Sequence, residues 1–196
     1  MSRLTQRIEV VQQSGPTKQI LKGAKRDRIV LPFDSSALRK LIFEAVKDAK
    51  DLEESAVRTL ETFKKAYEDY GATRIGYVSG VVTSDGPEFM LINTKILARY
   101  TDHLAKTSEI PLFAATDVLF NADFAPRLEK RPEPEFYRFW RRILQSGYVT
   151  DILMSPRWRI SNGAKDELEA AKEVGLRVHY LDDHKDLLAI FAALRP

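Results

Sequence analysis

The sequence lacks cysteine altogether and contains only three histidines among its 196 residues. Without cysteine there are no disulfides and no thiolate metal sites, which is typical of a cytoplasmic protein. The histidines, His103, His179 and His184, show no ligand spacing such as H-x-x-x-H. We therefore expect no metal site and no cofactor.

Long apolar runs are missing as well. No run approaches the roughly 20 residues that a membrane-spanning helix needs, and residues 1–15 have no apolar core of a signal peptide. Hydrophobic residues make up 44% of the chain and charged residues 30%, as in ordinary globular proteins. The prediction is a cytoplasmic protein without a membrane partner.

Three widespread nucleotide and hydrolase motifs are also absent. The segment "SGVVTSDG", residues 79–86, is not a G-x-G-x-x-G dinucleotide fingerprint. The chain has no G-x-x-x-x-G-K-[ST] phosphate loop and no G-x-S-x-G nucleophile elbow. The sequence therefore excludes nucleotide binding through a dinucleotide fingerprint, ATP hydrolysis by a P-loop, and serine hydrolases that carry a nucleophile elbow.

Positive charge is concentrated at the N-terminus. The first 28 residues hold seven basic and two acidic side chains, whereas the remaining 168 hold 24 basic and 26 acidic ones. We interpret residues 1–33 as a basic arm. Basic and aromatic residues do not alternate in it, which argues against a nucleic-acid partner.

Residues 34–72 form a predicted helical extension. Apolar residues recur at steps of three and four from Leu38 to Tyr70, the pattern of one apolar helix stripe. The stripe fits one long helix or two helices broken near residues 47–54, with Gly71 as the stop. It would pack either on the rest of the chain or, as a homo-oligomer through residues 35–70, on a second copy.

Residues 73–196 alternate between strand and helix patterns. Strands are expected at 74–82, 110–118, 149–156 and 176–182, and helices at 87–107, 134–147, 162–175 and 183–195. This alternation predicts an α/β, Rossmann- or flavodoxin-like parallel sheet with helices on both faces. Ligands of such sheets bind at the C-terminal ends of the strands, where loops 79–86, 115–124 and 155–167 are expected to meet.

Two of these loops carry groups suited to a small anionic ligand. Ser79 and Gly80 end the first strand, and a glycine lets the backbone approach a ligand closely. Ser161, Asn162 and Gly163 open a helix, whose free N–H groups favour an anion such as phosphate. In the alternative interpretation, Ser161 or Asn162 is only a helix cap and Gly163 only a tight turn.

Glu167 lies one turn into the same helix. A carboxylate held against a sugar C1 can break a glycosidic bond with retention, by forming a glycosyl ester that a second acceptor releases. The competing interpretation is a solvated charge favoured by the helix dipole, as for Glu169 and Glu173.

Three segments together, "GYVSG", "DILMSPRW" and "SNGAKDELEAAKEVGLRVHYL", resemble the nucleoside 2-deoxyribosyltransferase superfamily. That superfamily includes nucleoside 5'-monophosphate N-glycosidases. The resemblance covers residues 74 to about 182 and depends on the order and spacing of the segments. It implies cleavage or transfer at the N-glycosidic bond of a (deoxy)nucleoside 5'-monophosphate, in a dimer or larger oligomer whose subunits complete each other's sites.

The resemblance also implies roles for individual residues. Glu167 falls on the nucleophile, and Ser161 on the position where phosphate-accepting members carry serine. Ser79 and Gly80 fall on the loop that lines the sugar and phosphate pocket, and Asp151 matches the aspartate of the later strand.

One family acid has no counterpart, because its position falls near Trp140. Asp85, Asp117 or Asp123 would then have to protonate the leaving base. The gap leaves a non-catalytic nucleotide sensor or assembly protein as the alternative function.

Aromatic side chains allow two further predictions. Trp158 either stacks on a base or covers the edge of the sheet. At helical spacing, Phe136, Phe139, Trp140 and Ile143 are expected in the core, with the intervening arginines in solvent.

Overall fold

The computed structural model describes residues 33–119 and 133–195. Nearly all of the predicted basic arm and the candidate acid Asp123 lie outside these residues. The strands are β1 (Gly76–Ser79), β2 (Leu112–Ala114), β3 (Asp151–Met154) and β4 (Arg177–Tyr180). The helices are α1 (Ser35–Val46), α2 (Leu52–Tyr70), α3 (Met90–Ala105), α4 (Ala115–Val118), α5 (Glu133–Leu144), α6 (Asn162–Glu173) and α7 (Lys185–Leu194).

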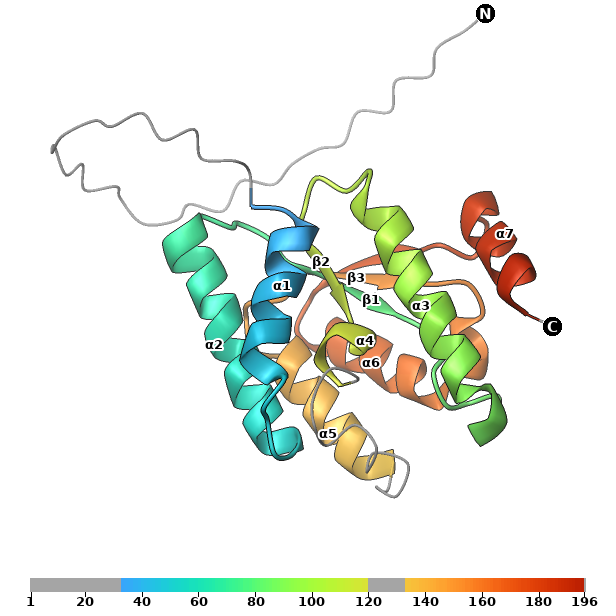
Figure 1. Cartoon of the computed structure of the whole chain (residues 1–196), viewed down its shortest axis with the longest axis horizontal. Coiled ribbons are helices and arrows are strands. Elements are labelled where there is room, and N and C mark those ends of the chain that lie inside the picture. The colour runs from blue at the N-terminus through green and yellow to red at the C-terminus, as the bar shows by residue number, and fades with distance from the viewer. Residues whose placement is uncertain (1–32, 120–132, 196) are drawn as a thin grey trace, which may run out of the picture. The chain divides into compact units, whose positions relative to one another are not determined.

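The four strands form one parallel sheet in the order β2-β1-β3-β4. Val78 of β1 pairs with Ala114 of β2 on one side and with Leu153 of β3 on the other. Helices α3 and α7 cover one face, and α1, α2, α5 and α6 cover the other (Figure 1). The predicted α/β class with helices on both faces is confirmed.

The strand order explains where a ligand site is expected. The chain leaves β1 toward β2 through α3, and returns past β1 to β3 through α5 on the other face. Right-handed crossovers in opposite directions place their helices on opposite faces. The order therefore reverses between β1 and β3, and a crevice opens outside the C-terminal ends of these two strands.

Residues 34–72 form two helices that belong to the body of the protein. The side chains of Asp34 and Asp51 cap α1 and α2, and Gly71 ends α2 with a positive φ of 70°. Most of the apolar stripe is buried within the same compact unit as the sheet, and only its last residue, Tyr70, is exposed. Phe63 of α2, for example, packs on Phe113 of β2 with ring centroids 4.9 Å apart. Because most of the stripe packs inside the chain, it does not offer an exposed apolar face to a second copy. The homo-oligomer through residues 35–70 therefore stays a prediction that this stripe does not support.

The second expected strand, residues 110–118, is shorter than its apolar pattern indicates. It ends at Ala114, and the next four residues form the short helix α4. The carboxylate of Asp117 accepts a hydrogen bond from the backbone N–H of Ala114 at 2.8 Å. This bond satisfies the backbone N–H at the N-cap of α4 and so favours the start of a helix. The apolar character of residues 115–118 alone predicted that the strand would continue.

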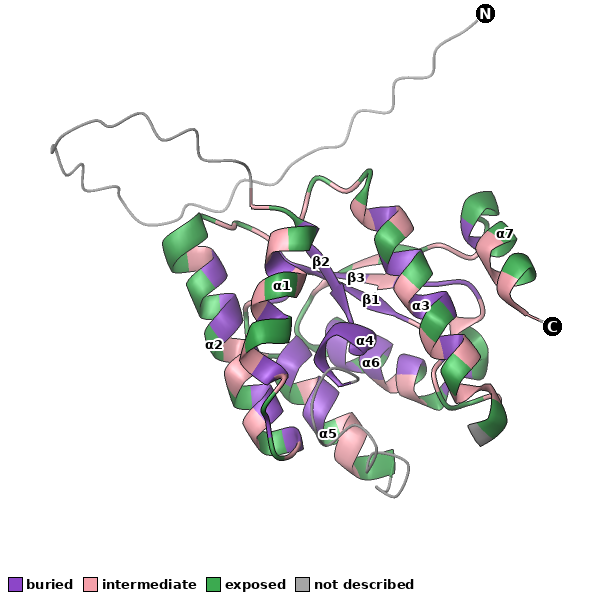
Figure 2. Cartoon of the chain, viewed as in Figure 1, coloured by how far each residue is buried: buried purple, intermediate pink, exposed green. Residues whose placement is uncertain are grey.

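Helix α5 has the predicted core face. Phe139, Trp140 and Ile143 are buried, and Phe136 is half-buried (Figure 2). Trp140 packs on Tyr77 of β1 with ring centroids 4.9 Å apart.

Among the described residues, no helix is both long and apolar enough to cross a membrane.

Candidate functional site

Strand β1 directs two polar side chains to one face of the sheet. Residues alternate between faces along a strand, so Tyr77 and Ser79 point the same way, toward α6. Both side chains are buried. Gly80, which follows, allows close packing as well as backbone access. A Cβ atom on Gly80 would lie 2.5 Å from Oγ of Ser155, a distance that side chains do not tolerate.

Both β1 hydroxyl groups bind the carboxylate of Glu167. Tyr77 donates a hydrogen bond to Oε1 at 3.0 Å, and Ser79 donates one to Oε2 at 2.5 Å. Glu167 is only 6% exposed, and within the described ranges no basic side chain forms an ion pair with it. Burial raises the pKa of Glu167 to about 7, although the bonds from Ser79 and Tyr77 pull it down. Glu167 is therefore not a solvated helix charge.

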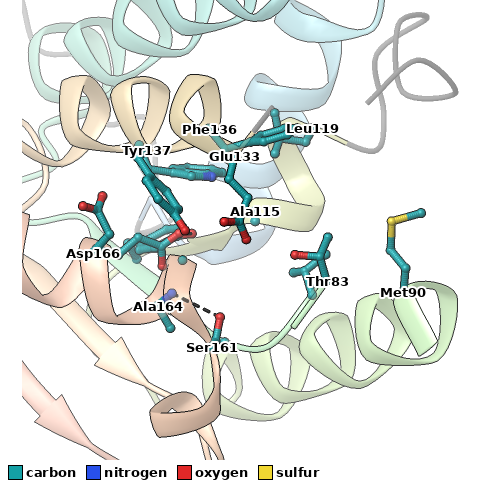
Figure 3. A pocket seen from close by; sticks show the side chains of 16 residues that line it. Thr83, Met90, Ala115, Leu119, Glu133, Phe136, Tyr137, Ser161, Ala164 and Asp166 are labelled. Atoms are coloured by element: carbon teal, nitrogen blue, oxygen red, sulfur yellow. Dashed lines mark hydrogen bonds between the residues drawn. The ribbon is translucent and has the colours of Figure 1, made fainter. Parts of the chain in front are cut away.

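Glu167 lies at the wall of a cavity of about 300 Å³. The lining residues come from β1 and the loop after it, from the start of α3, from α4 and the residue after it, from α5 and from the start of α6: Tyr77, Gly80, Val82, Thr83, Met90, Ala115, Leu119, Glu133, Phe136, Tyr137, Trp140, Ser161, Gly163, Ala164, Asp166 and Glu167. Figure 3 shows Tyr137 and Glu133 of α5 facing Ser161 and Ala164 across this space. The cavity thus occupies the crevice predicted at the C-terminal ends of the strands.

The N-terminus of α6 forms one end of this cavity. Ser161 caps the helix by accepting a hydrogen bond from the N–H of Ala164 at 3.2 Å, and its hydroxyl also accepts one from Ser84 at 3.2 Å. Gly163 lines the cavity, whereas Asn162 is exposed and does not. Ser161 is therefore both a cap and a cavity wall, so the two interpretations of this residue are compatible.

Of the acids expected to help the leaving base, Asp85 and Asp117 do not line the cavity, and Asp123 lies outside the described residues. Asp85 is paired with Arg157 at 3.0 Å and with Arg195. Asp117 is buried after β2 and is paired with Arg39 at 2.7 Å. Burial raises the pKa of Asp117 in spite of Arg39. These two carboxylates hold neighbouring segments together at the rim of the sheet.

Asp151 lies at the opposite end of the sheet from Glu167. It begins β3 beside Gly76, whereas Ser79, which contacts Glu167, ends β1. Asp151 is fully buried and is held by Arg74 at 2.6 Å and His179 at 2.9 Å. The structure therefore does not bring Asp151 and Glu167 together.

Trp158 also lies outside the cavity lining. Its ring packs on Tyr180 of β4 with centroids 5.7 Å apart, and its Nε1 donates to Asp182 at 3.2 Å. Of the two predictions for this residue, covering the sheet edge fits these contacts.

Several cavity residues are not among the predicted site residues, and three of them carry polar groups close to the proposed chemistry: Tyr77, Glu133 and Tyr137. Tyr77 could have been found from strand alternation, since it lies two residues before Ser79. The hydroxyl of Tyr137 donates a hydrogen bond to Glu133. Burial is the larger cause that raises the pKa of Tyr137, and this hydrogen bond is the second. No sequence pattern indicates Glu133 or Tyr137 as a site residue, because the aromatic spacing of this helix predicts core packing.

The fold and site define a parallel α/β protein with a buried, pocket-facing glutamate at the reversal of strand order. Comparison with known proteins adds no family to this class: no family model, no curated protein and no solved structure matches the chain.

Proposed function

We propose that the protein cleaves or transfers at the N-glycosidic bond of a (deoxy)nucleoside 5'-monophosphate, with Glu167 as nucleophile. The observation that carries this proposal is the Glu167 carboxylate. It is buried, oriented by two hydroxyl donors and open to a cavity of suitable size. Positioned, partly desolvated carboxylates are the means by which proteins attack sugar carbons. The sequence resemblance to nucleoside 2-deoxyribosyltransferases supports the same chemistry.

In the first step, an oxygen of Glu167 bonds to C1' of the sugar as the C1'–N bond breaks. The electron pair of that bond goes to the base nitrogen, which takes a proton from an acid in the pocket. In the second step, water or a second base attacks C1' and releases Glu167. Water gives a hydrolase, and a base gives a transferase.

Glu133 is the acid best placed to protonate the leaving base. It lines the cavity and receives a hydrogen bond from Tyr137. Asp166 also lines the cavity, but its carboxylate is already engaged in an ion pair with the Arg141 guanidinium at 2.8 Å. This assignment replaces Asp85 and Asp117, whose carboxylates are held by ion pairs away from the cavity.

The phosphate would be held at the start of α6. The hydroxyl groups of Ser161 and Ser84 lie within hydrogen-bonding distance of each other, and the first N–H groups of a helix are free to donate. Within the described part of the chain, the cavity lining contains no lysine or arginine. Recognition would therefore depend on hydroxyl and amide donors.

The test is incubation of the full chain with a panel of nucleosides and nucleoside 5'-monophosphates, with free base measured by chromatography. We expect base release from a monophosphate, and loss of that release by at least about 10³-fold in Glu167→Ala. Glu169→Ala is the matched control, since Glu169 lies on the same helix and is exposed.

Two results would contradict the enzyme. If no base is released from any member of the panel while a monophosphate binds at Ser161, the protein is a nucleotide sensor or assembly protein. If Glu167→Ala retains the release of wild type, Glu167 is not the nucleophile.

A further inference from the structure

Two of the three histidines meet on the face of the sheet that α3 and α7 cover. His103 is in the last turn of α3, and His184 is the N-cap residue of α7. Their rings are 5.6 Å apart in an edge-to-face arrangement. Asp186, in the first turn of α7, brings its carboxylate to 3.6 Å from Nε2 of His103. The three side chains offer one ligand atom each, all within 4.8 Å of one another.

We propose that His103, His184 and Asp186 bind a borderline divalent transition-metal ion, with zinc as the reference case. Two imidazoles and one carboxylate are a recurrent ligand set for such ions, and water completes the coordination. None of the three residues lines the cavity beside Glu167. The inference is therefore independent of the proposed glycosidic chemistry.

A second observation points to a missing partner at this place. Nδ1 of His184 is buried and has no hydrogen-bond partner among the described residues. A buried polar atom without a partner is costly, and an unseen ion or water is the usual explanation. The side chain of His184 also makes no capping hydrogen bond to α7, so it is available for another role.

The geometry needs only a small closure to hold the ion. With bonds of about 2.0 Å, ligand atoms around a tetrahedral zinc ion lie roughly 3.3 Å apart. Asp186 and Nε2 of His103 are already near this spacing at 3.6 Å. The side chains of His103 and Asp186 are 32% and 72% exposed, so both can adjust and leave a position open to water.

Occupation of the site would join the last turn of α3 to the first turn of α7. These helices already pack on each other, so the ion would fix an existing contact. Because the unfolded chain holds no such preformed site, binding would stabilise the folded protein. Imidazole must lose its proton to bind, so affinity would fall in acid.

The test uses the tag-free full chain after chelator treatment, titrated with Zn²⁺ by calorimetry. We expect one ion per chain, a rise in melting temperature, and visible absorption bands with Co²⁺ that report its coordination. Mg²⁺ and Ca²⁺ prefer oxygen-rich sites and should not compete.

Variants identify the ligands. His103→Ala and Asp186→Asn should each weaken Zn²⁺ binding by at least about 10-fold, since even loss of an outer-shell partner has that effect. His179→Gln and Asp183→Asn are the matched controls, because these residues lie outside the cluster, and they should bind as wild type does. Circular dichroism checks that each variant is folded.

The inference is overturned if Zn²⁺ does not bind stoichiometrically, or if Mg²⁺ binds equally well. It is also overturned if both ligand variants retain wild-type affinity, or if His179→Gln loses affinity as they do.

Discussion

Oγ of Ser79 lies 2.5 Å from Oε2 of Glu167, a residue 88 positions further along the chain. Together with Tyr77, Ser79 holds an acid in the protein interior without a described cation to balance it. Burial opposes the charge of Glu167, whereas the two hydroxyl groups favour it. An anion held in this way is costly to the fold and well suited to attack an electrophile, which gives several testable consequences.

Glu167→Gln should stabilise the protein at alkaline pH. The pKa of Glu167 is raised from 4.5 to about 7 in the fold. Below about pH 4.5 Glu167 is protonated in both the folded and the unfolded protein, so it costs the fold no stability. As pH rises from about 4.5 through about 7, the unfolded chain gives up this proton first, and the free energy of unfolding falls. The lost stability is on the order of 3 kcal/mol above pH 7.

Glutamine has the shape of the acid without the charge, so the variant should melt at a higher temperature than wild type at pH 8. Near pH 4 the difference should nearly vanish. Thermal unfolding at the two pH values measures this. An equal shift at both would show that the gain does not come from the charge of Glu167.

Ser79→Ala should move the pH dependence of base release. If Glu167 attacks as a carboxylate, kcat/KM should increase with pH through about 7, the pKa of Glu167 in the free protein. Removal of the Ser79 hydroxyl takes away a bond that lowers this pKa. The rising limb should then shift to higher pH by about one pH unit.

The pH profile of kcat/KM for one monophosphate makes this measurement, with Ser55→Ala as control. Ser55 is equally buried but lies on α2, outside the cavity lining. If the rising limb of the pH profile does not move in Ser79→Ala, the Ser79 hydroxyl does not influence the ionisation of Glu167.

Much of this arrangement can be read from the residues in order. Strand and helix periodicity predicts the parallel α/β class, because apolar spacing follows the geometry of each element. The spacing from Ser161 to Glu167 predicts their place at the start of α6. The direction of β3 also predicts the position of Asp151. Because Asp151 precedes the apolar residues of this strand, it lies at the N-terminal end of the parallel strands, away from the cavity.

Pairings between distant segments could not be predicted in this way. Asp85 is bound by Arg195, 110 residues later, and nothing local in either segment indicates the other. The same holds for His103 and His184, whose spacing in the chain carries no ligand pattern, although the packing of α3 on α7 brings their rings together.

Gly163→Ala should separate ligand binding from folding. Outside the backbone of its own helix, a Cβ atom on Gly163 would have, among the described residues, Oγ of Ser161 as its nearest atom at 3.8 Å, so the added methyl group has room. Alanine in a helix is more stable than glycine by about 0.5–1 kcal/mol. We expect a variant that is as stable as wild type or more so, with monophosphate affinity reduced by at least about 10-fold. Calorimetric titration with undiminished affinity would show that the ligand does not approach this backbone.

Ser161→Asp should abolish the preference for a phosphorylated ligand. Aspartate caps a helix as well as serine does, so α6 should remain formed. Its negative charge would repel a phosphate, whereas a free nucleoside carries no charge to be repelled. The ratio of kcat/KM for a monophosphate to that for the matching nucleoside should fall by about 10-fold or more, and an unchanged ratio would place the phosphate elsewhere.

Asp151→Asn should destabilise the protein and leave the chemistry at Glu167 unchanged. Burial raises the pKa of Asp151, but hydrogen bonds from Arg74, Thr150 and His179 outweigh it and hold the pKa below its ordinary value. Such a group stabilises the fold above its unfolded pKa of about 3.8, and this stability is lost as pH falls through the folded pKa.

The Asp151→Asn substitution removes charge-assisted hydrogen bonds worth about 1.5–3 kcal/mol, while the Arg74 side chain, 33% exposed, stays in contact with solvent. Urea unfolding at pH 7 should show this loss for Asp151→Asn and little change for Asp48→Asn, because Asp48 is exposed. The difference should narrow below about pH 4. Base release per folded molecule should equal that of wild type, since Asp151 lies at the opposite end of β3 from the cavity. A large fall in kcat with intact stability would instead restore Asp151 to the catalytic role that the sequence resemblance implied.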